Sequence, residues 1–244
     1  MLQLFQGFGI ELEYMLVDAG TLDVAPQADW LLAAAAGSPT DQYLDGELAW
    51  DNELALHVVE FKLVEPAPAL AGLAGRFHAG IGRANALLAG RGLALMPSAM
   101  HPWMDPLREL RLWPHGNREV YAAFDRIFSC QGHGWANLQS MHINLPFADD
   151  TEFAALHAAV RFLLPVMPGL AASSPVMDGR LNGTADNRLA VYRGNCRRIP
   201  SVTGAVVPEP VYGIGEYQDR ILGRIYADLA PHDPQGVLAQ EWVN

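Results

Sequence analysis

Carboxylate side chains alternate with apolar ones in two short segments of this sequence. Residues 8–17 (FGIELEYMLV) contain Glu11 and Glu13, and residues 57–64 (HVVEFKLV) contain Glu60, each between apolar neighbours. Successive side chains of a β-strand point to opposite faces of a sheet, so both segments predict a strand with one apolar and one polar face. We therefore expect the three carboxylates on the side of the sheet that faces away from the core.

A third alternating segment brings a histidine to the same kind of face. Residues 138–146 (LQSMHINLP) predict a strand whose apolar side carries Met141, Ile143 and Leu145, while Ser140, His142 and Asn144 lie on the other side. Three predicted strands that each carry apolar side chains on one face and polar side chains on the other indicate one common polar surface. For a single strand, the alternative is an ordinary solvated sheet face that carries acids.

Several carboxylates on one surface repel one another unless cations neutralise them. Hard oxygen ligands favour Mg²⁺, and a histidine among them is better tolerated by Mn²⁺. Glu53 lies seven residues before Glu60, an odd offset, so a turn or bulge must separate them if both face one cavity. The predicted metal ligands are Glu11, Glu13, Glu53, Glu60 and His142.

A glycine- and arginine-rich segment, residues 178–198 (DGRLNGTADNRLAVYRGNCRR), is the second candidate site. Guanidinium groups and the backbone N–H groups of such loops bind phosphate or carboxylate. The alternative is a surface loop whose arginines pair with aspartates. The local basic density contrasts with the whole chain, which has 27 acidic and 16 basic residues and a net charge of −11. The arginines are Arg180, Arg188, Arg193, Arg197 and Arg198.

Composition restricts the class of protein. Half of the 244 residues are hydrophobic and 18% are charged, which is typical of a globular chain. No apolar run reaches the roughly 20 residues that span a bilayer, and the first residues lack the basic region of a signal peptide. Cys130 and Cys196 form neither a disulfide framework nor a zinc motif, which favours a cytoplasmic location. The negative charge argues against nucleic acid, so small molecules are the expected partners, and self-association stays open.

The remaining pattern is one of helices between these strands. Apolar residues at helical spacing predict four helices, and the apolar run at residues 93–98 predicts a buried strand. Strands with one apolar face suggest an antiparallel sheet that packs on helices on one side only. We therefore expect the α+β class, with residues 1–244 as a single catalytic-type domain and the other sheet face left polar for a ligand. The expected helices span 67–89, 117–128, 149–164 and 215–229.

Four motifs in this order resemble the glutamate–cysteine ligase family, especially its type 2 or carboxylate–amine ligase branch. The resemblance covers about residues 9–200. The matching pieces are Gly9-Ile10-Glu11-Leu12-Glu13, the pair Glu53 and Glu60, Met141-His142-Ile143-Asn144, and Ala172-Ser173-Ser174-Pro175 followed by glycines and Arg188.

The resemblance implies a fold and a reaction. The fold is similar to glutamine synthetase and the guanidino kinases, with a curved antiparallel sheet whose concave face holds ATP and metal. The reaction, as in glutathione biosynthesis, is phosphorylation of the γ-carboxylate of glutamate by ATP, followed by attack of an amine such as that of cysteine. ATP and Mg²⁺, or Mn²⁺ in its place, are the implied cofactors. By position, Glu60 and Arg188 resemble catalytic residues, and the implied nucleotide contacts are Arg180, Arg188, Arg193 and Asn144.

The chain departs from the family pattern at two places. Asn144 matches the classical ligases rather than the H-x-H form of type 2, and no E-x-R pattern follows residue 200. We therefore expect a chain truncated at its C-terminus and inactive as it stands. The first alternative is a non-catalytic relative that binds nucleotide or amino acid as a subunit or sensor. A metal-dependent hydrolase would explain the carboxylates but would leave the arginine-rich segment unused. The amine acceptor is not identified.

Overall fold

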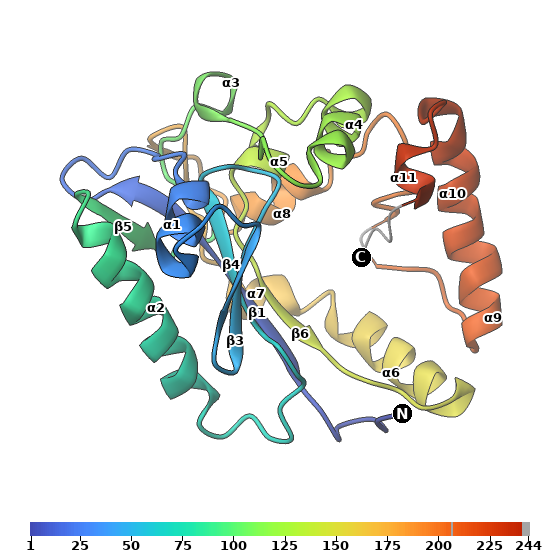
Figure 1. Ribbon diagram of the computed structural model, residues 1–244. Coiled ribbons are helices and arrows are strands. Elements are labelled where there is room, and N and C mark those ends of the chain that lie inside the picture. The colour runs from blue at the N-terminus through green and yellow to red at the C-terminus, as the bar shows by residue number, and fades with distance from the viewer. Residues whose placement is uncertain (206, 241–244) are drawn as a thin grey trace.

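A computed structural model describes residues 1–205 and 207–240 of the chain. Its centre is a sheet with the order β2-β3-β4-β1-β5, in which β6 also pairs with β1, and every pairing between these strands is antiparallel (Figure 1). The chain is thus a mixed α/β protein with a mainly antiparallel sheet, as expected. The strands are β1 (Gly9–Asp18), β2 (Gln42–Asp45), β3 (Leu48–Asn52), β4 (Val58–Leu63), β5 (Leu93–Met96) and β6 (Met141–Asn144).

β1 is the strand that joins the others. Leu12 pairs with Phe61 of β4 and with Met141 of β6, so these two strands lie on opposite edges of β1. Met15 likewise pairs with β4 and β5, which places β5 on the same edge of β1 as β6, further along the strand. The three strands expected to carry the polar face are therefore neighbours around the first half of β1.

Helices and a small hairpin surround this sheet. α1 (Ala28–Ala36) and α2 (Leu73–Ala89) pack against one face (Figure 1). The arginine-rich segment contains the second strand of a small hairpin and a helix rather than one extended loop. The other elements are α3 (Pro106–Glu109), α4 (Arg118–Phe128), α5 (His133–Ala136), α6 (Asp150–Leu163), α7 (Met167–Ala171), β7 (Val176–Met177), β8 (Arg180–Leu181), α8 (Asn187–Tyr192), α9 (Ile214–Tyr217), the π-helix η1 (Gln218–Leu222), α10 (Gly223–Leu229), the 3₁₀ helix η2 (Ala230–His232) and α11 (Val237–Gln240).

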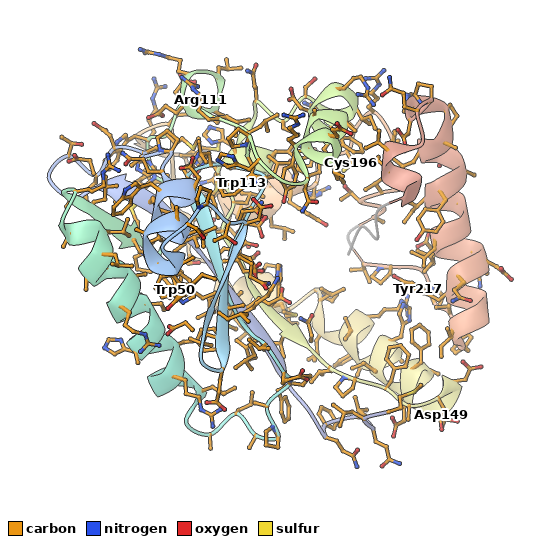
Figure 2. The ribbon with its side chains drawn as sticks, viewed as in Figure 1. Trp50, Arg111, Trp113, Asp149, Cys196 and Tyr217 are labelled. Atoms are coloured by element: carbon orange, nitrogen blue, oxygen red, sulfur yellow. The ribbon has the colours of Figure 1, made fainter. Side chains whose placement is uncertain are left out.

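The main core lies between the sheet and the first two helices. Trp50 of β3, labelled in Figure 2, and Phe61 of β4 are fully buried there, and their ring centroids are 5.4 Å apart. α2 begins at Leu73 rather than at residue 67, because Ala67 lies between two prolines, stays extended and pairs with Phe8. Its buried residues share one face at helical spacing: Leu73, Phe77, Gly80, Ala84 and Leu88.

A second apolar cluster lies on the opposite face of the sheet, which corrects the expectation that this whole face is polar. Met15 and Val17 of β1 point to the same side as Glu11 and Glu13, yet both are fully buried. They pack with Val58 of β4 and with residues from the segments around α3, α4 and α5. The polar surface is therefore confined to the first half of β1, next to a dry second core.

β6 differs from the sequence prediction in its apolar side. The strand is shorter than residues 138–146, and Met141 and Ile143 are 60% and 52% exposed instead of buried. The alternation correctly separates them from His142 and Asn144. An alternating pattern does not show whether another element covers a face. In the described part of the chain, no element buries the side of β6 that carries Met141 and Ile143.

Among the C-terminal helices, α9 contacts α6 and α11 contacts α4. Tyr217 of α9, labelled in Figure 2, packs edge-on against Phe153 of α6. The ring centroids of Tyr217 and His157 are 5.9 Å apart. α6 starts as predicted, because the Asp149 side chain accepts hydrogen bonds from the backbone N–H groups of Thr151 and Glu152. Among the described residues, no helix combines the length and apolar character needed to cross a membrane.

Candidate metal and substrate site

The strand register assembles the predicted ligands. Glu13 lies opposite Glu60 in the β1–β4 pair, and Glu11 lies opposite His142 in the β1–β6 pair. Their side chains form two groups whose potential ligand atoms lie within 4.8 Å of one another: Glu11 with Glu60 and His142, and Glu13 with Glu53 and Glu60. All five predicted ligands are thus brought together, and Glu60 belongs to both groups.

Glu53 reaches the cluster because a turn follows β3. The strand ends at Asn52, and β4 begins only at Val58, so the chain reverses direction between the two glutamates, as their odd offset requires. Two backbone hydrogen bonds hold this connection: Trp113 N–H donates to the Leu54 carbonyl (2.9 Å) and Leu56 N–H donates to the Arg111 carbonyl (2.8 Å). Figure 2 marks Arg111 and Trp113. The position of Glu53 therefore depends on a segment distant in sequence.

A chain of hydrogen bonds orients the carboxylates of β1. Asn144 Nδ2 donates to Glu11 Oε1 (2.7 Å), and Glu11 Oε2 lies 2.8 Å from His142 Nδ1. His142 Nε2 lies 2.9 Å from Ser140 Oγ, which donates to Glu13 Oε1 (2.8 Å). The backbone N–H of Ser140 donates to the other oxygen of Glu13 (3.0 Å). His142 and Asn144 of β6, with Ser140 just before the strand, thus hold the carboxylates of Glu11 and Glu13 in place.

The carboxylates carry more negative charge than the nearby side chains balance. Burial raises the pKa values of Glu13 and Glu60 above their ordinary range. Burial, with the added charges of Glu13 and Glu60, raises the pKa of Glu53 to about 8. Lys62 Nζ lies 3.0 Å from Asp51 Oδ2 and 3.1 Å from Glu60 Oε2. Within residues 1–205 and 207–240, it is the one lysine or arginine ion-paired to this cluster.

The donor set fits a divalent cation. Four carboxylates and one imidazole supply oxygen and nitrogen ligands of the kind that Mg²⁺ and Mn²⁺ accept. Burial and the unneutralised charges of Glu13 and Glu60 make the ionised form of Glu53 unfavourable and so raise its pKa. A bound dication would remove that repulsion.

The predicted anion-binding residues differ in their exposure and in their hydrogen-bond partners. Arg188 lies beside the start of β6: its Nη1 donates to the Gln139 carbonyl (2.9 Å), and its backbone N–H donates to Ser174 Oγ (3.0 Å). Arg180 and Arg193 are exposed and make no ion pair with the carboxylates in the described part of the chain. Asn144 is bonded to Glu11 and so acts on a predicted ligand.

One polar residue of the cluster, Asp51, escaped the sequence interpretation. Asp51 stands opposite Glu60 in the β3–β4 pair and forms an ion pair with Lys62. Its offset of two residues from Glu53 was the available signal, but the strand that contains it, β3, was not predicted from the sequence. Ser140 lies on the same side as His142, as its place in the alternating segment 138–146 predicts, and it links His142 to Glu13.

The two cysteines are not placed for nucleophilic chemistry. Cys130 and Cys196 are buried in apolar clusters. Burial, with the charge of Asp125, raises the pKa of the Cys130 thiol to about 12, and burial raises that of Cys196. Neither thiol is a ready nucleophile, in agreement with the sequence interpretation.

Comparison with known proteins agrees with this geometry. The model of the family described as glutamate–cysteine ligase family 2 matches residues 7–220. An uncharacterized protein of Archaeoglobus fulgidus is 32% identical over 236 residues, which is 97% of this chain and 63% of that protein. A Bradyrhizobium protein named "Putative glutamate--cysteine ligase 2" is 33% identical over 198 residues, or 76% of this chain and 42% of the relative. A Pseudomonas paraeruginosa protein of the same name is 30% identical over 194 residues, 75% and 46% of the two lengths. The chain thus spans less than two thirds of these relatives.

Proposed function

The chain belongs to glutamate–cysteine ligase family 2, and from this membership we propose that its carboxylate face serves an ATP-dependent ligase that joins glutamate to an amine. The observation that carries the proposal is the convergence of Glu11, Glu13, Glu53, Glu60 and His142 on one face of the sheet. We extend the proposal to the fold, for which an antiparallel sheet with acids on one face supports a likeness to glutamine synthetase.

In the proposed reaction, the γ-carboxylate oxygen of glutamate attacks the γ-phosphorus of ATP and ADP leaves. The nitrogen of an amine such as cysteine then attacks the acyl carbon, the bond to the phosphate oxygen breaks, and the amine loses a proton. The products are an amide, ADP and phosphate. Mg²⁺ or Mn²⁺, when bound by the carboxylates, would supply the neutralising charge that phosphoryl transfer requires.

The residues of the chain have separable tasks in this proposal. Glu11 and Glu13 present fixed oxygen atoms, since polar groups on and next to β6 hold them. Glu60 contributes to both groups of ligand atoms. Arg188 is near enough to the start of β6 to offer its remaining N–H groups to a phosphate or carboxylate, for which a planar fork is suited.

A second candidate function is binding of nucleotide or amino acid without turnover. It is favoured by the sequence, in which no E-x-R pattern occurs between residues 201 and 244. Such a protein would need the same metal-binding face. The two candidates differ in ADP release rather than in binding.

The test is Glu60→Gln, with Glu65→Gln as the matched control. Glu65 is exposed just beyond the end of β4, outside both groups of ligand atoms. In wild type and control we expect Mg²⁺-dependent ATP binding by calorimetry. An assay of ADP release with glutamate and an amine, from a panel that includes cysteine, then separates the two candidates. Glu60→Gln should weaken Mg²⁺-dependent binding by about tenfold or more, with little loss of thermal stability. Equal binding by both variants would refute the metal-site proposal, and binding without ADP release would favour the second candidate.

A further inference from the structure

Lys62 has a position that the ligand groups alone do not explain. It is the single lysine of the sequence. It lies on β4 directly opposite Glu11 of β1, and its ammonium stands between Asp51 and Glu60 at 3.0 and 3.1 Å. Its side chain is 36% exposed, whereas those of Asp51 and Glu60 are 13% and 9% exposed. A positive charge therefore reaches the edge of the acidic face from a strand that is otherwise buried.

Glu60 is shared between Lys62 and both candidate metal groups. A dication that takes up the Glu60 carboxylate competes with the ammonium for the same oxygens, and two cations so close repel each other. An ammonium has three N–H donors, and the described part of the chain offers Lys62 two acceptors. When metal is bound, Asp51 still anchors the ammonium, which then has donors available on the accessible side.

An anionic oxygen placed between the metal and the ammonium would remove this repulsion and accept the available N–H group. We propose that Lys62 binds an anionic oxygen of a substrate, either a phosphoryl oxygen of the nucleotide or a carboxylate oxygen of the amino acid. This inference rests on the proposed function, because it requires metal on the Glu60 carboxylate. It makes Asp51 a positioning residue that keeps the lysine in place when Glu60 turns to the metal.

The single lysine makes a direct test feasible. Protein grown with ¹³Cε-lysine gives one side-chain Cε signal in a carbon–proton correlation spectrum, which needs no assignment. We expect this signal to move when Mg²⁺ is added. With Mg²⁺ saturating, it should move again on addition of either a non-hydrolysable ATP analogue or L-glutamate. The arm that produces the second shift identifies the source of the anionic oxygen. No second shift with either compound, although calorimetry shows that both bind, would overturn the inference.

Variants separate substrate binding from support of Glu60. Lys62→Met should bind Mn²⁺ at least as tightly as wild type, because it removes a competing cation. At saturating Mn²⁺, its affinity for the compound identified above should be about ten- to a hundredfold weaker, the effect of losing a charge-assisted contact. Lys62→Arg should recover part of that loss. Arg83→Met is the matched control, since Arg83 pairs with Asp45 at the far side of the sheet.

Three other results would contradict the inference, each in a recognisable way. Unchanged affinity of Lys62→Met for both compounds would show that Lys62 only balances charge. Loss of Mn²⁺ binding in Lys62→Met would show that it acts through Glu60. A wild type that binds neither Mn²⁺ nor nucleotide would refute the proposed function, and the lysine assignment with it. If Lys62→Met fails to fold, the substrate affinity of Lys62→Arg and the Cε signal of wild type still test the inference.

Discussion

Replacing Glu53 by glutamine should stabilise the metal-free protein at alkaline pH. The pKa of Glu53 is raised from 4.5 to about 8, by burial and by the charges of Glu13 and Glu60. Between these two values the folded protein binds a proton that the unfolded chain has released. The free energy of unfolding therefore falls as the pH rises from 4.5 to about 8, and it changes little on either side. Glutamine cannot ionise, so the variant should lack this part of the fall.

The size of the effect follows from the shift in pKa. One pKa unit corresponds to about 1.36 kcal/mol, so the upper bound is about 5 kcal/mol. Some of the Glu53 side chain remains accessible to solvent, which lowers the cost of its charge. We expect wild type to lose about 2 kcal/mol more than Glu53→Gln between pH 5 and pH 8.5.

Urea unfolding at half-unit steps of pH, with a chelator present, measures this difference. Glu65→Gln serves again as the control and should follow wild type. Repeating the series with Mg²⁺ adds a second readout, because the metal binds the ionised carboxylates and so stabilises wild type more at pH 8 than at pH 6. Curves for wild type and Glu53→Gln that stay parallel from pH 5 to pH 9 would refute the placement of Glu53 among uncompensated charges.

Three further predictions concern single residues. His57 is fully buried and burial lowers its pKa to about 4, so stability should fall by about 3 kcal/mol as the pH drops from 6.5 to 4, and His57→Gln should lose less in the same acid titration by circular dichroism. Ser140→Ala removes the link between Glu13 and His142 and should weaken Mn²⁺ binding by about tenfold in a calorimetric titration, while unchanged affinity would show that the link has no effect on the ligands. Arg188→Lys loses the guanidinium fork and should raise KM for ATP or glutamate; normal kinetics for both would make Arg188 a structural residue that serves only the Gln139 carbonyl.

The sequence predicted the candidate site better than the fold around it. The alternation of β1 and β4 correctly separated Glu11, Glu13 and Glu60 from the main core, because strand side chains have a fixed period of two. Register does not follow from that period. That Glu13 lies opposite Glu60, and Glu11 opposite His142, depends on how distant strands align.

Some elements were not predicted because their local signals are short. The β2–β3 hairpin turns at Gly46, which has a φ of +68°, but its first strand is only four residues long. α1 is an alanine-rich run whose helical spacing is weak. The exposure of Met141 and Ile143 was missed for another reason: an alternating pattern shows which side chains share a face but not whether another element covers that face.

The pairing of β6 with β1 also determines when the candidate site can form during folding. Glu11 and His142 are separated by 131 residues, whereas Glu13 and its partner Glu60 on β4 come from the first quarter of the chain. Closing a long loop costs more conformational entropy than closing a short one, and pairings between distant segments slow folding. The sheet formed by β1, β3 and β4 can therefore assemble with its core before the chain supplies the imidazole of His142 and the hydroxyl of Ser140. We expect the ligand geometry to be completed only after β6 has paired with β1, so a ribosome-bound chain that ends before residue 140 should lack the groups that hold the carboxylates of Glu11 and Glu13.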